Sequence, residues 1–329
     1  MSDFWKDEPS IEAKLQQVRS LILTSIEQSN YFIRDLLFDR VTKGGKMIRP
    51  ALVIIGSQLG KKESEDEALR VASVLEMIHM ASLIHDDIID GAKTRRGIAT
   101  INSKVGPKQA VLAGDYLLAR AMTLVKGKKG DLESTAITNS FSRLCESELE
   151  QDADVGNFLI SSSTYFRRIG GKTASLFALS AYAGAAVCSA EKYQQNLLHR
   201  IGYCLGIAFQ IKDDILDYTG DAQKLGKAIG QDVHVGIPTY PLIAALKIEA
   251  NNNFDKRPLY ELVKNIKPLS KRESKKVVEL TISLGGVEKA EEIAQKYIDR
   301  AFIDIEKLGN KEVQELLISL FTKLSLRHI

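Results

Sequence analysis

The sequence predicts an almost entirely helical protein, and three observations support that prediction. Apolar residues recur with the helical period of 3.6 along most of the chain, while alternating strand patterns are nearly absent. The seven prolines stand at or near the edges of these periodic segments, where helices tolerate proline. No long Ser/Pro/Gly linker or low-complexity tract interrupts the chain, so we expect a single domain over residues 1–329.

The expected helices follow from where each periodic segment begins and ends. In chain order they cover residues 10–38, 47–60, 65–91, 107–126, 131–155, 163–188, 191–218, 238–251, 257–266, 270–284, 286–308 and 311–327. Glycines mark the expected breaks at Gly44-Gly45, at residues 126–130 and at Gly170-Gly171, and a longer break covers residues 219–237.

Composition excludes several classes of protein. Lys and Arg total 45 against 42 Asp and Glu, so no overall charge favours nucleic acid or an anionic membrane. The three cysteines, Cys145, Cys188 and Cys204, have no C-x-x-C spacing and fall in apolar helical stretches, which favours reduced core thiols over disulfides or metal ligands. The acidic N-terminus does not resemble a signal peptide. We therefore expect a cytoplasmic protein with at most peripheral membrane contact.

Two acidic clusters are the most informative feature of the chain. Asp86, Asp87 and Asp90 form one D-D-x-x-D string, and Asp213, Asp214 and Asp217 form another, each at the end of an apolar helical run. The first and last aspartates of each string are four residues apart and share a helix face. Carboxylate oxygens suit Mg²⁺ held jointly with substrate phosphates. The sequence therefore predicts a magnesium–diphosphate site.

An isolated string of this kind is more often a solvated helix end. Two observations weigh against that interpretation here. Acidic residues are unfavourable at a helix C-terminus, where the dipole is already negative, and the same string occurs twice in one chain.

Basic residues stand near both clusters and could bind phosphate. Lys46 and Arg49 open an expected helix directly after Gly44-Gly45, where the helix N-terminus favours anions. Arg95 and Arg96 follow the first cluster, and arginine has the planar donor geometry that fits phosphate.

A third basic stretch lies further along the chain. Lys172 and Thr173 follow Gly170-Gly171, and Lys212 and Lys227 flank the second cluster. For any one of these residues, ordinary surface charge is the alternative interpretation.

Taken together, these motifs resemble the trans-isoprenyl diphosphate synthases. The resemblance rests on four patterns in this order: G-G-K-x-x-R-P from Gly44, D-D-x-x-D-x-x-x-x-R-R-G from Asp86, G-K-T from Gly171 and F-Q-x-x-D-D-x-x-D from Phe209. It covers roughly the middle 200 residues, from about Gly44 to Pro241. It implies an all-α isoprenoid synthase fold, a helical bundle around a large central cavity. It also implies a Mg²⁺-dependent prenyltransferase, usually a homodimer, that condenses isopentenyl diphosphate with an allylic diphosphate.

The resemblance also implies a role for each matching residue. Metal ions, roughly three with the bound diphosphate, would be held by Asp86, Asp87, Asp90, Asp213, Asp214 and Asp217. Arg95 would hold the allylic diphosphate, and isopentenyl diphosphate would be held by Lys46, Arg49, His79 and Arg96. The reacting end would be lined by Lys172, Thr173, Gln210 and Lys227. For His79, a core histidine with satisfied hydrogen bonds is the alternative.

One position departs from the family pattern. After Asp232 the family usually reads E-G-K-x-T-x-P, whereas this chain has Ile237 in place of the lysine. One cationic contact to the allylic diphosphate is therefore missing or supplied by another residue.

The product length is predicted from the residues just before the first cluster. A growing chain that runs from Asp86 back along its helix, at about 1.5 Å per residue, meets Ser82 and Ala81 first. In the family, aromatic residues at these positions close the cavity, and both are small here. By analogy we expect about six to nine isoprene units, about C30–C45, as in quinone side chains. Ile137 and Phe141, four apart on one helix, could form the floor. Close helix packing is the alternative explanation for the two small residues.

Three other functions remain open at this point. The chain could be a shorter-chain farnesyl or geranylgeranyl diphosphate synthase, or a terpenoid enzyme that cyclises a prenyl diphosphate. A cyclase would leave Lys46, Arg49 and Arg96 without a purpose. The chain could also be a non-catalytic subunit of a prenyltransferase, although such a subunit would be expected to lose aspartates and all six stand.

Overall fold

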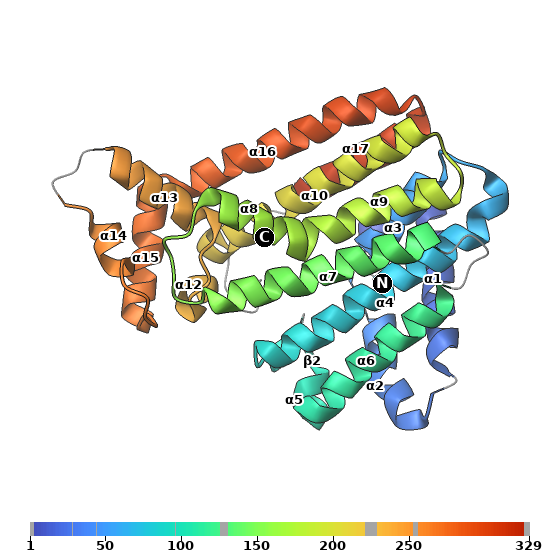
Figure 1. Ribbon diagram of the computed structural model, residues 1–329, viewed down its shortest axis with the longest axis horizontal. Helices are drawn as coiled ribbons and strands as arrows, with labels where there is room; N and C mark the ends of the chain where they lie inside the picture. The colour runs from blue at the N-terminus through green and yellow to red at the C-terminus, as the bar shows by residue number, and fades with distance from the viewer. Residues whose placement is uncertain are drawn as a thin grey trace. The chain divides into compact units, whose positions relative to one another are not determined.

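The computed structural model describes residues 3–27, 29–43, 45–95, 97–125, 131–220, 229–252 and 256–325. Within these ranges most residues are helical, and one short two-stranded hairpin is present (Figure 1). The all-α fold class is confirmed.

The chain is grouped into two compact units, and each unit is assembled from separate stretches of sequence. Unit 1 comprises Met1–Phe141, Leu176–Gly202 and Lys307–Leu317. Unit 2 comprises Ser142–Ser175, Tyr203–Glu306 and Ile318–Ile329. A single domain over residues 1–329 stays a prediction.

The helices and strands are assigned to the units as follows. Unit 1 contains η1 (Asp3–Trp5), α1 (Pro9–Glu27), α2 (Tyr31–Thr42), α3 (Ile48–Ser57), η2 (Lys62–Ser64), α4 (Glu65–Ile89), β1 (Thr94–Arg95), β2 (Ile98–Ala99), α5 (Ile101–Val105) and α6 (Pro107–Leu124). Unit 2 contains α8 (Ser162–Ile169), η3 (Gly170–Ala174), α12 (Gln231–Val235), α13 (Tyr240–Asn251), α14 (Pro258–Val263), α15 (Lys271–Ser283) and α16 (Gly286–Ile305). Both units draw residues from α7 (Asp131–Ala153), α9 (Ser175–Val187), α10 (Lys192–Thr219), η4 (Glu306–Leu308) and α17 (Lys311–Ser325).

Helix α4 is the core helix of unit 1. It packs against α1, α3 and α6, and Figure 1 shows α6 running beside it. Nearly every residue from Ala68 to Ala81 is buried, which explains why the helix is apolar on all sides. By length and composition alone α4 could span a membrane, but 78% of the apolar window is buried inside the protein. Burial of this kind is typical of a core helix.

The helix predicted over residues 10–38 is wrong in one respect, because it is two helices. Helix α1 ends at Glu27, and α2 begins after Asn30. The Asn30 side chain accepts a hydrogen bond from the Ile33 N–H at 3.0 Å, so Asn30 is the N-cap of α2. An asparagine that satisfies backbone donors in this way favours a helix start over helix continuation.

The helix predicted over residues 163–188 is confirmed, whereas the break predicted within it at Gly170-Gly171 is wrong. These residues belong to the π-helical segment η3, which continues α8 into α9. A Cβ at Gly170 would lie 2.8 Å from the Tyr203 hydroxyl, and one at Gly171 would collide with Ser147. The glycines are therefore required for close packing and do not end the helix.

Several short elements of the described chain fall outside the predicted helices. They are the antiparallel β1–β2 pair, the five-residue helices α5 and α12, and the three-residue helices η1 and η2. Helix α12 lies inside the predicted break over residues 219–237, of which residues 221–228 lie outside the described part of the chain.

The core of unit 2 lies around α13. Helix α13 packs against α15 and α16, and its buried side chains include Leu242, Ile243 and Ala245. The buried Glu249 on α13 accepts hydrogen bonds from the backbone N–H groups of Leu259 (2.8 Å) and Tyr260 (2.9 Å). This carboxylate satisfies the first donors of α14 and fixes where that helix begins.

The cysteines are free thiols, in agreement with the prediction. Cys188 is buried, and burial raises its pKa to about 11. Cys145 is exposed on α7, which corrects the expectation that all three lie in the core.

Candidate active site

The first acidic cluster lies at the C-terminal end of α4, in unit 1. The Asp90 N–H donates to the Asp86 carbonyl at 2.8 Å, so these two residues are one helical turn apart. Asp86 is half-buried, Asp90 is exposed and Asp87 is 1% exposed. The three carboxylates therefore have very different access to solvent.

Asp87 is held between two guanidinium groups. Its Oδ1 accepts a hydrogen bond from Arg95 Nε at 2.6 Å, and its Oδ2 is paired with Arg40 of α2. A buried carboxylate requires such partners because burial without them is strongly unfavourable. Both oxygens of Asp87 are thus engaged by the protein.

Arg40 was not identified by the sequence analysis. It lies 47 residues before Asp87, on a helix without any of the family motifs, so no local spacing could have revealed the contact. Lys104 and Lys43 both pair with the adjacent Asp39, at 3.1 and 2.9 Å. This end of α2 is therefore bound by ion pairs to α4 and α5.

The β1–β2 hairpin positions Arg95. Arg95 pairs with Ile98 across the hairpin, and Gly97 adopts a φ of 75°, which side chains other than glycine rarely adopt. After the hairpin, Thr100 caps α5 and donates to the Ala92 carbonyl at 2.7 Å. These bonds hold Arg95 beside Asp87, whereas Arg96 lies outside the described residues.

The basic segment before α3 is held by aromatic residues. The Lys46 carbonyl accepts a hydrogen bond from the Trp5 indole at 2.6 Å, and the Lys46 ammonium lies 4.6 Å from the centre of the Phe4 ring. The Arg49 guanidinium lies 4.5 Å from the centre of the Phe177 ring. Both cations are thus positioned by cation–π contacts.

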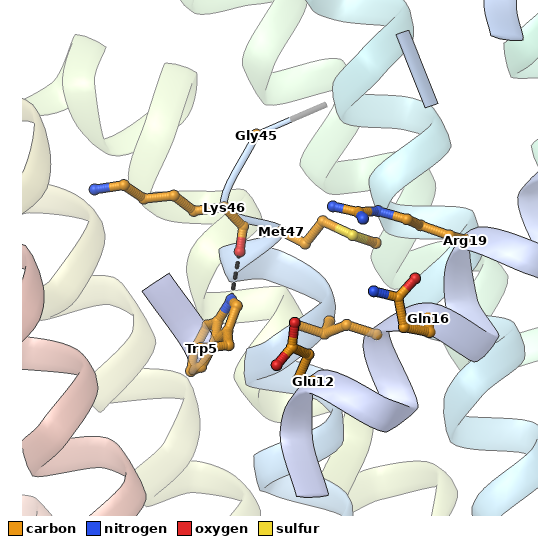
Figure 2. A pocket seen from close by; sticks show the side chains of 8 residues that line it. Trp5, Glu12, Gln16, Arg19, Gly45, Lys46 and Met47 are labelled. Carbon is orange, nitrogen blue, oxygen red and sulfur yellow. Dashed lines mark hydrogen bonds between the residues drawn. The ribbon is translucent and has the colours of Figure 1, made fainter. Parts of the chain in front are cut away.

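Met47 adopts a left-handed conformation at the start of α3, with φ 49° and ψ 45°. A residue with a Cβ in this conformation is strained unless its surroundings hold it there. Met47 is buried beside Lys46 in a small pocket that α1 also lines, through Glu12 and Arg19 (Figure 2). Figure 2 shows Lys46 extending away from Arg19, so the two cations do not converge.

The remaining unit 1 residues of the prediction lie on α4 and α7. His79 is half-buried on α4. Ala81 is 0% exposed and Ser82 is 7% exposed, and the Ser82 hydroxyl donates to the His79 carbonyl at 2.9 Å. On α7, Ile137 is buried and Phe141 is half-buried. Their roles in substrate binding and chain length stay predictions.

The second acidic cluster lies on α10, in unit 2. Asp214 is buried, and its two oxygens accept hydrogen bonds from the Tyr165 hydroxyl (2.6 Å) and from Gln210 Nε2 (2.9 Å). Thr173 donates to Gln210 Oε1 at 2.8 Å. The structure thus brings together Thr173, Gln210 and Asp214, which the family motifs had singled out separately.

Burial dominates the electrostatics of this network. Burial, followed by the negative charge of Asp232, raises the pKa of Asp214 to about 8, although the hydrogen bonds from Tyr165 and Gln210 oppose the shift. Burial also raises the pKa of Tyr165 well above its ordinary value. Within the described part of the chain, the carboxylate partners of Asp214 are a hydroxyl and an amide, whereas those of Asp87 are cations.

Tyr165 was also missed, although the sequence carries a signal for it. It precedes Thr173 by eight residues, a spacing that places both side chains on one face of a helix. This spacing applies because η3 continues α8 into α9, so the helix is unbroken between Tyr165 and Thr173.

Asp217 is fully buried and organises the start of α12. Its carboxylate accepts hydrogen bonds from the backbone N–H groups of Gln231 (3.2 Å) and Asp232 (3.0 Å). Its carbonyl accepts one from the Gly230 N–H at 2.7 Å. The last aspartate of the motif therefore connects α10 to α12.

Lys172 forms an ion pair with Glu148 of α7, at 2.7 Å, and Glu148 had not been identified from the sequence. Lys227 lies outside the described residues. Ile237, the departure from the family pattern, is half-buried, and its N–H donates to the Asp232 carbonyl at 2.8 Å.

The carboxylates of the two clusters fit Mg²⁺, but the six aspartates differ in solvent exposure and in the hydrogen bonds that their oxygens accept. Nowhere in the described chain do three His, Cys, Asp or Glu side chains form a group that could hold a metal ion alone. Mg²⁺ does not require one, because it is commonly held by one or two carboxylates together with substrate phosphates. Asp90 and Asp213 are exposed and Asp86 is half-buried, whereas the oxygens of Asp87, Asp214 and Asp217 already accept protein hydrogen bonds. Metal binding by each aspartate stays a prediction.

Comparison with known proteins identifies the family. The family model described as polyprenyl synthetase matches residues 31–281. The chain is 33% identical over 308 residues to octaprenyl diphosphate synthase of Haemophilus influenzae, covering 93% of this chain and 92% of the relative. It is 35% identical over 277 residues to decaprenyl-diphosphate synthase of Dictyostelium discoideum, covering 84% of this chain but only 58% of that relative's length. A third relative, at 34% identity, is heptaprenyl diphosphate synthase component 2 of Geobacillus stearothermophilus, with 83% of each chain covered.

Solved structures give the same result. Heptaprenyl diphosphate synthase from Staphylococcus aureus matches with a TM-score of 0.89 at 31% identity, over 97% of this chain and 99% of that one. Geranylgeranyl pyrophosphate synthase from Lactobacillus brevis matches with a TM-score of 0.88 at 30% identity, over 98% and 99%. The chain therefore belongs to the polyprenyl synthetase family, the trans-isoprenyl diphosphate synthases, whose members are prenyltransferases.

Proposed function

We propose that this protein is a long-chain trans-polyprenyl diphosphate synthase. It adds isopentenyl diphosphate repeatedly to an allylic diphosphate such as farnesyl diphosphate, giving products of about C30–C45. One observation carries the chain-length part of this proposal. The two residues one turn before Asp86, Ala81 and Ser82, are small and lie on the buried core helix of unit 1.

The charged residues divide into two groups in this proposal. Arg95 holds the allylic diphosphate, and its orientation depends on Asp87 and Arg40. Lys46 and Arg49 hold isopentenyl diphosphate, together with His79 and Arg96. Because guanidinium groups held in fixed positions need no reorganisation as charge develops, they stabilise the departing pyrophosphate effectively.

Asp86, Asp90 and Asp213 are the carboxylates that we assign to Mg²⁺. When bound, Mg²⁺ supplies positive charge that stabilises the leaving pyrophosphate. Asp87, Asp214 and Asp217 are assigned to positioning, because their carboxylate oxygens accept hydrogen bonds from the protein. We assign Lys172, Thr173 and Gln210 to the reacting end, where the allylic cation must be protected from water.

Two alternatives follow from the names of the relatives. A relative named geranylgeranyl pyrophosphate synthase is structurally as similar as a relative named heptaprenyl diphosphate synthase, so a shorter product is the second candidate. A relative named component 2 raises the possibility of a partner subunit of different sequence. We propose a homodimer instead, because α2 and α6 pack together and expose Tyr31, Phe38 and Leu112.

One assay separates these functions. The purified chain alone is incubated with farnesyl diphosphate, isopentenyl diphosphate and Mg²⁺, and product length is read by chromatography. Long prenyl diphosphates from the single chain are expected. Folded protein that elongates nothing until a second subunit is added would refute the homodimeric enzyme, and a product that stops at geranylgeranyl diphosphate would refute the long-chain assignment.

Substitutions on α4 test the proposed product length. Ser82→Phe and Ala81→Phe are expected to shorten the product by several isoprene units, because an aromatic ring one turn from Asp86 obstructs the growing chain. Met80→Phe is the matched control, since Met80 is the neighbouring buried residue on α4 and the exchange nearly conserves volume. Circular dichroism checks that each variant folds. Equal product lengths for Ser82→Phe and Met80→Phe would show that the chain does not pass Ser82.

A further inference from the structure

Unit 2 contains one strongly basic segment, although the net charge of the whole chain is small. Residues 256–276 carry eight Lys and Arg side chains against two Glu, whereas the whole chain has a net charge of only +3. The segment covers α14, the loop that follows it and the first turns of α15. Three of these lysines form ion pairs with glutamates, namely Lys264, Lys267 and Lys276. Lys271, Arg272 and Lys275 are exposed and form no ion pair with another described residue. This surface therefore presents cationic groups that the fold does not neutralise.

An isoleucine stands at the exposed tip of the loop in this segment. Ile266 is 72% exposed, and it lies between the exposed Lys264 and Lys267. The loop is nevertheless firmly attached, because Val263 before it and Leu269 after it are buried in the core of unit 2. Ile266 is therefore exposed although both ends of its loop are anchored in the core.

Both helices beside the loop are capped. Glu249 satisfies the first N–H groups of α14, and Ser270 forms a capping box with Glu273 at the start of α15. Hydrogen bonds from Ser270 and Lys267 lower the pKa of Glu273 to about 2, so it stays ionised. The loop is thus held at both ends by specific hydrogen bonds.

Further apolar side chains surround the loop. A Cβ at Gly156 would lie 3.7 Å from Cγ2 of Ile266, and a Cβ at Gly236 would lie 3.1 Å from Cγ1 of Val155. The Gly156 N–H donates to the Gly236 carbonyl at 2.9 Å, which joins the two turns. Val155 is 45% exposed and Val235 is 44% exposed. We call the exposed side chains of Ile266, Val155 and Val235, with the cations of residues 256–276, the basic apolar surface.

We propose that the basic apolar surface docks this enzyme on anionic lipid bilayers. Ile266 and its apolar neighbours insert at the boundary between headgroups and acyl chains, and the surrounding lysines and arginines are attracted to acidic headgroups. Neither group of side chains would bind strongly alone, since stable attachment to a membrane generally requires two signals.

The arrangement favours a lipid surface over nucleic acid. Binding of single strands relies on exposed aromatic side chains on which bases stack. The one aromatic residue of this segment, Tyr260, is half-buried and lies 4.5 Å beneath the Arg257 guanidinium. Dispersed, flexible cations around an apolar tip complement a fluid anionic surface, and this docking does not depend on product length.

Co-sedimentation of the full chain with vesicles tests the proposal without any substrate. The vesicles contain phosphatidylcholine either alone or with roughly a third of phosphatidylserine. The wild-type chain is expected to sediment with the anionic vesicles only, and to be released at about 0.5 M NaCl because salt screens the attraction. A chain that ignores anionic vesicles, or that binds both kinds equally, would overturn the proposal and would leave the prenyltransferase assignment untouched.

Two pairs of variants locate the surface. Ile266→Ser and the double variant Lys271→Glu/Lys275→Glu are expected to weaken vesicle binding by about tenfold or more. Ile303→Ser, at the 54% exposed Ile303 of α16, and Lys108→Glu/Lys311→Glu are the matched controls and are expected to change binding less than about twofold. Prenyl transfer in detergent should be the same for all four. Controls that lose as much binding as the loop variants would show that general charge and apolarity, rather than this surface, are responsible.

Discussion

The two acidic clusters have the same motif but different electrostatic surroundings. The second aspartate is buried in both, yet Asp87 lies between two guanidinium groups and Asp214 between a tyrosine hydroxyl and an amide. Burial without a cation raises the pKa of Asp214 to about 8. The shared D-D-x-x-D motif therefore specifies a helix end and a helix face, whereas residues distant in the sequence decide the charge on its aspartates.

Exchanging the second aspartate for asparagine gives the largest expected effect. Asp87→Asn removes the buried negative charge that pairs with both Arg40 and Arg95, and the free energy of unfolding should fall by about 3 kcal/mol. Urea denaturation monitored by circular dichroism measures this loss. Asp90→Asn, at the exposed end of the same cluster, should change stability by less than about 0.5 kcal/mol. Similar losses in the two variants would contradict the buried ion pairs.

A smaller effect is expected from Arg40, the residue specific to the first cluster. Arg40→Met leaves Asp87 paired with Arg95 alone, so stability should fall by about 1–2 kcal/mol. The KM for the allylic diphosphate should rise more than kcat falls, since Arg95 loses its fixed orientation. Arg40→Lys should restore part of the loss, because it keeps the charge without the planar donors.

Arg34→Met, at an exposed arginine of the same helix, is the control for Arg40→Met and should behave like the wild type. If Arg40→Met lowers stability but leaves KM unchanged, then Arg40 has a structural role and does not position Arg95.

An effect of opposite sign, which depends on pH, is expected for Asp214→Asn. A folded-state pKa near 8 against about 4 in the unfolded chain means that the native protein binds more protons between these pH values. Stability of the metal-free wild type should therefore fall as pH rises from about 4 to 8. The asparagine variant lacks this decline and should melt on the order of a few degrees higher at pH 8, with no advantage at pH 4.

Thermal melts in chelator across this pH range measure the difference. Asp213→Asn serves as the control because Asp213 is exposed. A decline of equal slope in the wild type and in Asp214→Asn would show that the carboxyl of Asp214 does not titrate there.

The sequence predicted the helices well because most of them bury one continuous apolar stripe. Helix α4 was placed at 65–91 and ends at Ile89, and α10 was placed at 191–218 and ends at Thr219. It failed at Asn30, where the apolar period continues across a helix boundary and only the side-chain cap reveals the break. The break predicted at Gly170 is wrong because glycine occurs both in turns and at close helix contacts, whereas the apolar period of residues 163–188 continues through it.

The sequence predicts which residues belong to the candidate site, but it predicts few of the contacts between them. Gln210 and Asp214 are four apart on one helix, so their contact follows from spacing. Arg40 could not be found in this way, because its partner is 47 residues distant and the contact depends on how α2 packs. The anchoring of α12 by Asp217 was equally hidden, since backbone donors have no sequence signature.

The contacts of Asp87 also have a consequence for local unfolding. This one residue is bonded to α2 through Arg40, to β1 through Arg95 and to α5 through Asn102, which donates to its carbonyl at 3.4 Å. A segment that separates from Asp87 admits water to this buried carboxylate, and the higher dielectric constant weakens its remaining ion pair. Hydrogen exchange in residues 31–42 and 94–105 should accordingly share one opening free energy, so that these segments behave as a single cooperative unit.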